Sequence, residues 1–308
     1  MITRLIHKLT TLALVLCALA LCSLTALAQD PNDLRPGSVL FFSRYTSNAS
    51  NPAAEDTQIN LTNTDPNRSI AVHIYMIDGS SCSVADSYVT LTQSQTTYFL
   101  ASDFDPGTRG YIIAVASSGG LPTQHNALLG VAYIREADGR LADIPAVAVT
   151  KRLAGTIDPG VDATATMTFD GGNTANSYDK LPATVAISTF NSQTTDSTIF
   201  TLYSPAGNLL TGENPSINIF GLMYNDLEQS RSLTFRINCY TQVALTSLRV
   251  LSGINNFIPR GSVGWMKMNA TGRPLLGVVL NKGPMFNGGR NLSTISLFNS
   301  YSITVPVF

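Results

Sequence analysis

Two stretches of this chain, 153 residues apart, follow nearly the same pattern. They read "FDPGTRGYIIAVA" (Phe104 to Ala116) and "FIPRGSVGWMKMNA" (Phe257 to Ala270). Each has Phe, one residue, Pro, a Gly, a polar step, a second Gly, an aromatic residue and an alternating tail. The proline ends one strand, the first glycine (Gly107 or Gly261) permits a turn, and Gly110 or Gly264 leaves room for a neighbouring strand. The pattern predicts two copies of one β-fold.

Further blocks on both sides of these stretches occur in the same order. "VLFFSRYTS" is followed by "DTQINLTN" and later by "ALLGVAYI", and the second half has "VAISTFNS", "DSTIFTLY" and "PLLGVVLN". Cys82 lies 28 residues before Gly110, and Cys239 lies 25 residues before Gly264. Chance similarity between β-rich segments is the alternative. The common order favours two copies, near residues 36–152 and 180–308, with the cysteines at matching positions.

The local pattern is that of strands almost throughout. In "SIAVHIYMI" (Ser69 to Ile77) apolar residues alternate with a second set, as in a half-buried strand. Turn signals recur every 8 to 12 residues, and Asp138-Gly139 predicts a hairpin. No convincing helical period is present. The predicted fold is therefore all-β, with two tandem, similar sandwich domains of immunoglobulin-like or jelly-roll-like type.

The N-terminus carries the features of a bacterial export signal. Arg4 and Lys8 precede the apolar run Leu12 to Leu21, and "Ala-Leu-Ala" at 26–28 is a cleavage pattern. A lipoprotein signal is the rival interpretation because Cys17 and Cys22 lie in this segment. We expect a signal peptide at 1–28, a mature chain from Gln29, domains at 36–152 and 180–308, and a tether at 153–179 that holds one strand, "TATMTF".

Charge is scarce in this sequence and evenly balanced. Charged residues make up 13% of the chain, against a globular norm of about 25%. Without the predicted signal, 17 basic residues stand against 20 acidic ones, with no basic cluster. Nucleic-acid binding therefore has no electrostatic basis. No second apolar run is long enough to span a membrane, so we expect no membrane span in the mature chain.

Two cysteines, Cys82 and Cys239, remain in the predicted mature chain. Two cysteines form neither a disulfide scaffold nor a zinc site. Matching positions in separate domains are usually far apart, whereas a disulfide needs Cα atoms within about 7 Å. We expect buried free thiols, with an interdomain disulfide and intermolecular bridging as the alternatives.

Residues that could support catalysis are few. We predict that His73 is a half-exposed strand residue and that His125 lies in a loop. Neither histidine lies in a hydrolase motif. The four glutamates, Glu55, Glu136, Glu213 and Glu228, have polar, turn-like contexts that predict solvated charges. "DPGVD" and "FDGGN" in the tether offer oxygen ligands for calcium but form no complete calcium motif. We therefore assign no catalytic, cofactor-binding or metal-binding residue and expect no cofactor.

Aromatic side chains are candidates for sugar-binding platforms. Trp265 is the only tryptophan and holds the position of Tyr111 in the other copy, which predicts a core residue. Possible surface aromatics are Tyr88, Tyr98, Tyr203, Tyr224 and Tyr301.

The sequence thus indicates a secreted, periplasmic or cell-surface protein with a structural or adhesive role and no catalysis. Expected partners are a cell-surface protein or glycan, or a second copy through sheet edges. The alternative is a carbohydrate-active protein, either a glycan-binding module or a glycosidase with a carboxylate pair.

Overall fold

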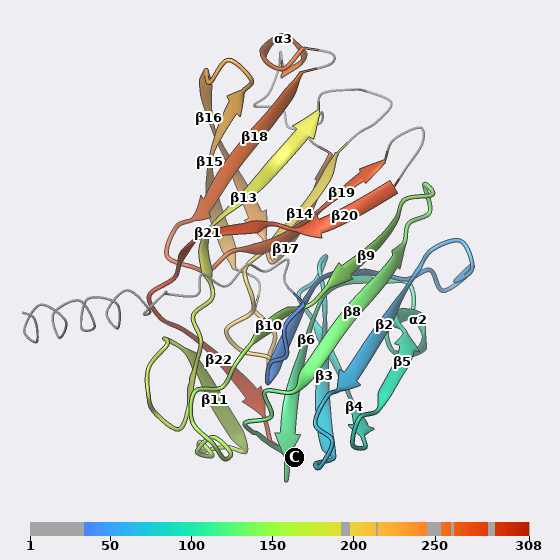
Figure 1. Ribbon diagram of the computed structural model, residues 1–308, viewed down its shortest axis with the longest axis vertical. Coiled ribbons are helices and arrows are strands. Elements are labelled where there is room, and N and C mark those ends of the chain that lie inside the picture. Colours follow the sequence, from blue (N-terminus) through green and yellow to red (C-terminus); the bar gives the residue numbers. More distant parts are fainter. Residues whose placement is uncertain are drawn as a thin grey trace, which may run out of the picture. The chain divides into compact units, whose positions relative to one another are not determined.

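The computed structural model describes residues 34–191, 198–213, 215–244, 254–259, 262–282 and 287–307. The described chain is all-β, as predicted, with two one-turn helices, α2 (Ala101–Phe104) and α3 (Ile254–Phe257). Its strands form five sheets (Figure 1). The predicted signal peptide at 1–28 and the mature N-terminus at Gln29 lie outside the described residues. No helix in the described residues is long and apolar enough to cross a bilayer.

The first half of the chain forms two antiparallel sheets. Sheet 1 has the order β10-β1-β6-β3-β4, with β7 paired to β6. Its strands are β1 (Val39–Thr46), β3 (Ile70–Asp78), β4 (Val84–Leu91), β6 (Arg109–Ser118), β7 (Leu121–Pro122) and β10 (Val147–Val149). Sheet 2 has the order β5-β2-β8-β9. Its strands are β2 (Asp56–Asn63), β5 (Thr96–Leu100), β8 (Leu128–Arg135) and β9 (Leu141–Pro145).

The second half forms another two antiparallel sheets. Sheet 3 has the order β16-β15-β18-β13-β21, and sheet 4 has the order β17-β14-β19-β20. The strands of sheet 3 are β13 (Pro182–Asn191), β15 (Ser216–Asn225), β16 (Ser230–Asn238), β18 (Val263–Ala270) and β21 (Ser293–Leu297). The strands of sheet 4 are β14 (Ile199–Tyr203), β17 (Tyr240–Ala244), β19 (Leu276–Lys282) and β20 (Asn287–Asn291).

The two halves repeat the same strand order. Taken in chain order, β1, β3, β4, β6 and β10 of sheet 1 occupy the places of β13, β15, β16, β18 and β21 in sheet 3. Sheets 2 and 4 correspond in the same way. The two similar stretches that were compared in the sequence form β6 and β18, each preceded by a one-turn helix. The other matched blocks also form corresponding strands, so the repeat in the sequence reflects a repeat in topology.

A fifth sheet joins the segment between the two copies to the last strand of the chain. It consists of β12 (Ser177–Tyr178), β11 (Thr164–Phe169) and β22 (Tyr301–Pro306). The strand expected at "TATMTF" is present as β11, but it pairs along its full length with β22 from the end of the chain. The segment 153–179 is therefore part of the folded body rather than only a tether.

The expected arrangement of two tandem sandwich domains is wrong, because residues 31–308 form one compact unit. The number of sheets, five, is the number of blades in a five-bladed propeller. Propeller blades, however, are four-stranded sheets repeated around a central channel, whereas this chain returns repeatedly to sheets that it has already entered.

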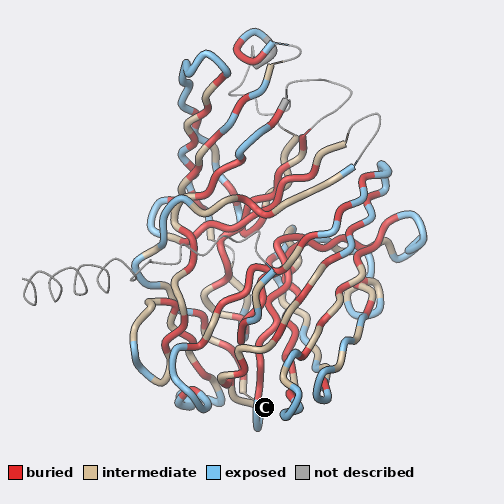
Figure 2. The backbone as a smooth tube through the Cα atoms, viewed as in Figure 1, coloured by how far each residue is buried: buried red, intermediate tan, exposed pale blue. Residues whose placement is uncertain are grey.

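Three apolar clusters hold the sheets together, and two of them include residues from both halves. One lies between sheets 1 and 2 and includes Val278 and Leu280 from β19. A second joins the other face of sheet 1 to sheet 5 and to residues of the second half, among them Tyr203. The third lies between sheets 3 and 4. The central strands β1 and β6 of sheet 1 are consequently buried on both faces, whereas residues of the edge strand β4 are exposed or half-buried. Figure 2 shows where the buried backbone, in red, is concentrated.

The two cysteines differ from the prediction in both their state and their positions. Cys82 and Cys239 form a disulfide, with their Cα atoms 6.0 Å apart, and are not free thiols. They do not hold matching positions either. Cys82 lies in the turn between β3 and β4, and Cys239 lies between β16 and β17, the counterparts of β4 and β5. Because the two halves pack together, non-equivalent turns come within bonding reach.

The glycine predictions are confirmed where the structure describes them. A Cβ on Gly110 would lie 1.8 Å from the carbonyl oxygen of Ile77, and one on Gly264 would lie 2.3 Å from Cδ1 of Ile258. Gly107 and Gly139 have φ of +84°, as their turns require. Gly261 lies outside the described residues.

Candidate functional site

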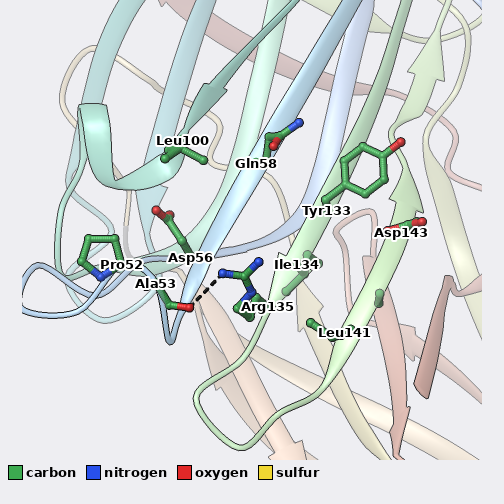
Figure 3. Close-up of a pocket in the computed structure, with 11 residues that line it drawn as sticks. Pro52, Ala53, Asp56, Gln58, Leu100, Tyr133, Ile134, Arg135, Leu141 and Asp143 are labelled. Atoms are coloured by element: carbon green, nitrogen blue, oxygen red, sulfur yellow. Dashed lines mark hydrogen bonds between the residues drawn. The ribbon is translucent and has the colours of Figure 1, made fainter. Parts of the chain in front are cut away.

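An open pocket of about 430 Å³ lies on sheet 2, on the side away from sheet 1 (Figure 3). Strands β2, β8 and β9 supply its floor, and Pro52, Ala53 and Leu100 line its rim. Its volume is in the usual range for small-ligand sites, about 300 to 1,000 Å³.

Strand register sets the side chains of this pocket in two rows. Gln58 pairs with Tyr133, and Tyr133 pairs with Asp143. In the next row Arg135 pairs with Asp56 on one side and with Leu141 on the other. Residues two apart in a strand point to the same face, so both rows lie on the outer face of the sheet, where Arg135 and Leu141 are exposed and Asp56 is buried. The Asp138-Gly139 hairpin, with Gly139 in its turn, fixes the register that places Asp143 beside Tyr133.

Two of the polar residues build the wall of the pocket. Arg135 donates from a terminal guanidinium nitrogen to the carbonyl of Ala53 at 2.8 Å, drawn as the dashed line in Figure 3. The carboxylate of Asp56 accepts from the hydroxyl of Ser102 at 2.6 Å and from the backbone N–H groups of Ser102 and Thr57. These contacts tie the loop before β2 and helix α2 to the edge of the pocket.

The remaining residues present an aromatic ring and planar polar groups to solvent. Tyr133 is 45% exposed, and Asp143 beside it is also exposed. Gln58 donates to the side-chain oxygen of Asn60 at 3.0 Å, which orients its amide. Amide and carboxylate groups bind pairs of neighbouring hydroxyls, and a tyrosine ring covers an apolar surface next to them. This combination suits a small polyhydroxylated ligand.

Sequence reasoning missed Tyr133, Gln58 and Asp143, because they come from three strands and form no motif. The alternation in "ALLGVAYI" and the Asp138-Gly139 hairpin contained the signal. Together they place Tyr133 and Asp143 on one outward face.

The two histidines are more deeply buried than predicted. His73, expected to be half exposed, is 2% exposed, and His125 is 1% exposed. His73 Nε2 donates to the carboxylate of Asp86 at 2.8 Å, and Nδ1 accepts from the hydroxyl of Tyr75 at 2.6 Å. His125 Nε2 lies 2.8 Å from the side-chain oxygen of Asn63. Neither histidine lines the pocket.

The glutamates were predicted to be solvated, and for two of them this is wrong. Glu55 and Glu136 are buried. Glu136 pairs with the fully buried guanidinium of Arg44, which also donates to Thr201 and Tyr240 in the second half. Glu55 accepts from the hydroxyl of Thr46. Glu213 pairs with Arg273 at 2.9 Å, and Glu228 is exposed.

Trp265 was predicted to be a core residue, and this too is wrong. It is 39% exposed, whereas Tyr111 in the corresponding strand is fully buried. The difference arises because sheet 5 packs over the Tyr111 face of sheet 1, while Trp265 belongs to none of the three apolar clusters. Of the five tyrosines named as possible surface aromatics, Tyr88 and Tyr98 are exposed, Tyr224 and Tyr301 are half-buried, and Tyr203 is buried.

Among the described residues, no group of three or more His, Cys, Asp or Glu side chains is placed to hold a metal ion. In the tether, the carboxylate of Asp170 accepts from the backbone N–H of Gly172 within the "FDGGN" turn.

Comparison with known proteins gives no family. No family model and no curated protein matches the sequence. Solved structures align weakly. A putative β-galactosidase from Bacteroides fragilis is 8% identical with a TM-score of 0.16, and the alignment covers 91% of this chain but 35% of that one. An oxalate decarboxylase–formate complex from Lactobacillus farciminis is 7% identical, with a TM-score of 0.19 and coverage of 87% and 76%. Vicilin from Capsicum annuum is 8% identical, with a TM-score of 0.17 and coverage of 87% and 75%.

Proposed function

We propose that this chain is an exported, non-catalytic adhesive protein that binds a glycan in the sheet 2 pocket. The observation that carries the proposal is the solvent-facing row Gln58, Tyr133 and Asp143 on a pleated floor. A ring beside an amide and a carboxylate matches the apolar face and the hydroxyl edge of a sugar.

The carboxylates of the pocket favour binding over hydrolysis. A glycosidase needs two carboxyl groups on opposite sides of the bond that it cleaves. Here Asp56 lies on β2 and Asp143 on β9, with β8 between them. Asp56 also accepts three hydrogen bonds from the chain itself, so it acts as part of the pocket wall.

A glycan array followed by calorimetry on the best ligand tests this function. We expect Tyr133→Ala to weaken binding about tenfold, which is the loss of about 1.4 kcal/mol of contact. Tyr98→Ala is the matched control, because Tyr98 is 66% exposed on the same sheet but does not line the pocket. Equal effects of the two variants would refute the assignment of the site, and release of reducing ends from the ligand would refute the non-catalytic role.

Export and self-association form the remaining part of the proposal. Intact mass of the exported protein tests cleavage before Gln29, and added lipid mass on a cysteine would contradict it. Strands β4 and β16 end their sheets and have one ladder neighbour each, so their outer backbone groups can pair with a second copy. Sedimentation velocity over a range of protein concentrations tests this association.

A further inference from the structure

The outer face of sheet 3, on the side away from sheet 4, presents aromatic residues to solvent. Burial alternates along β15 and β18, so Phe220, Tyr224 and Trp265 all point outward. Tyr224 and Trp265 are register partners, and their rings stack with centroids 4.2 Å apart and an interplanar angle of 9°. Phe220 is 45% exposed. We call this surface, carried by β16, β15, β18 and β13, the sheet 3 face.

Core packing does not account for these aromatics. In the first half, the corresponding face of sheet 1 carries Tyr111, Ile113 and Val115, and sheet 5 covers it. The sheet 3 face has the same place in the repeat, but the outward residues of β15 and β18 remain exposed or half-buried. The sheet 3 face is also more polar than the covered face of sheet 1. Hydroxyl and amide side chains surround its rings, namely Ser230, Ser232 and Thr234 on β16 and Asn269 on β18.

The charge of sheet 3 has one sign. None of its five strands contains an Asp or Glu, whereas Arg236 on β16 and Lys267 on β18 lie on the outward side. Arg231 points to the other side, where its guanidinium lies over the ring of Phe257. Lys267 sits at the centre of the face, beside Leu222 of β15 and Ala186 of β13. The nearest acids along these strands, Asp226 and Glu228, are exposed in the hairpin beyond Tyr224. The face therefore complements an anion.

We propose that the sheet 3 face binds an acidic polysaccharide, with uronic acid residues as its charged units. The C–H face of a pyranose ring packs on Trp265 or Phe220, and its hydroxyls reach the Ser, Thr and Asn side chains around them. The carboxylate pairs with Lys267. A second copy of this chain is a poorer occupant, because in a face-to-face dimer the cations of both copies would oppose one another. The proposal does not depend on the sheet 2 pocket.

The test uses Trp265 as its own reporter. It is the only tryptophan of the chain, so intrinsic fluorescence measures this face and not the pocket. The probe is a purified oligogalacturonate, with maltooligosaccharide of equal length as the neutral control. We expect saturable quenching or a blue shift with oligogalacturonate, and a weaker response when salt is added because ions screen the exposed charges.

Variants separate specific recognition from general attraction. Lys267→Gln should weaken oligogalacturonate binding about two- to fivefold, the range of a single exposed ion pair. Arg68→Gln removes a surface cation from the first half, one that is more exposed than Lys267, and should leave the titration unchanged. Tyr133→Ala, in the sheet 2 pocket, should also leave it unchanged.

Four outcomes would overturn the proposal. They are no change in Trp265 emission, an equal response to the neutral oligosaccharide, equal losses in Lys267→Gln and Arg68→Gln, and an emission shift that follows protein concentration without any sugar. The last would identify the face as a contact between copies. Suppose that glycan binding is lost in Tyr133→Ala and does not change the fluorescence of Trp265. That result would support the sheet 2 pocket as a glycan site and refute the sheet 3 face as one.

Discussion

Cys82 and Cys239 are joined by a disulfide although 157 residues separate them in the chain. Both adopt positive φ, 62° and 57°, at the ends of turns that are not equivalent in the repeat. The bond therefore links the β3–β4 turn of the first half to the start of β17 in the second. It fixes the packing of one half against the other at a point where both backbones are already constrained.

Removing this disulfide should destabilise the protein substantially. A crosslink that closes so long a loop restricts the unfolded chain, and native disulfides typically contribute about 2 to 5 kcal/mol. We expect the Cys82→Ala/Cys239→Ala double variant to lose a free energy of unfolding in that range, measured by urea titration. Thiol titration in guanidinium of a chain that starts at Gln29, and so lacks Cys17 and Cys22, should find two thiols after reduction and none before it. Two reactive thiols without reductant would contradict the bond.

The topological repeat was predictable because its signals are local. The Gly110 and Gly264 positions and the period-two blocks each act on a few residues, and they specified corresponding strands. Pro106 and Pro259 follow the one-turn helices α2 and α3 rather than the strands that we expected them to end. The packing of the halves was not predictable in this way. Sheet 5 pairs β11 with β22, which lie more than 100 residues apart in the chain. The sequence of neither strand indicates which strand it pairs with. Because sheet 5 packs on sheet 1 together with residues of the second half, the two halves form one folded unit and not two independent sandwiches.

The same cause explains the errors in the site analysis. Tyr111 and Trp265 occupy corresponding places, but a strand's own residues do not tell which faces of its sheet will be covered. Glu136 stands before a turn, a typical context for a solvated charge, yet β14 and β17 of the second half carry the Thr201 and Tyr240 side chains that bond its partner Arg44. The pocket row of Gln58, Tyr133 and Asp143 likewise required strand register, which the sequence specified only at the Asp138-Gly139 hairpin.

The buried pair of Arg44 and Glu136 should be costly to break. The guanidinium of Arg44 is inaccessible to solvent and bridges both halves. Glu136→Gln leaves that charge without its counter-ion, and removing one partner of a buried pair costs about 3 to 5 kcal/mol. Asp65→Asn is the control, because its partner Arg68 is exposed and such pairs contribute about 1 kcal/mol or less. Similar urea midpoints for the two variants would show that Arg44 does not depend on Glu136.

Stability should fall as the pH drops through the ordinary titration range of histidine. Burial lowers the pKa of His73, and the hydrogen bond to Asp86 opposes this shift only in part. Burial likewise lowers the pKa of His125. The unfolded chain therefore takes up protons before the folded one, so the stability present above about pH 6.5 is lost below it.

Urea midpoints at pH 7.5 and 5.5 measure this effect above the usual range of the carboxylates. The His73→Gln/His125→Gln variant should lose less stability between these two pH values than the unmodified protein, whatever its absolute stability. An equal or larger loss in the variant would assign the pH dependence to other groups.

The last prediction concerns the unequal covering of the two halves. Tyr111 is fully buried, stacks on Tyr203 with ring centroids 4.2 Å apart, and its hydroxyl accepts from the backbone N–H of Ala206. Trp265 stacks on Tyr224 but is 39% exposed. Truncating a buried large aromatic costs about 3 to 5 kcal/mol, whereas an exposed aromatic pair contributes about 0.5 to 1.5 kcal/mol. We therefore expect Tyr111→Ala to lower the free energy of unfolding at least twice as much as Trp265→Ala, although tryptophan is the larger residue. Native Trp265 emission should also be accessible to acrylamide. Equal losses, or emission shielded from acrylamide in the monomer, would mean that the sheet 3 face is covered as sheet 1 is, and would remove the basis for a ligand there.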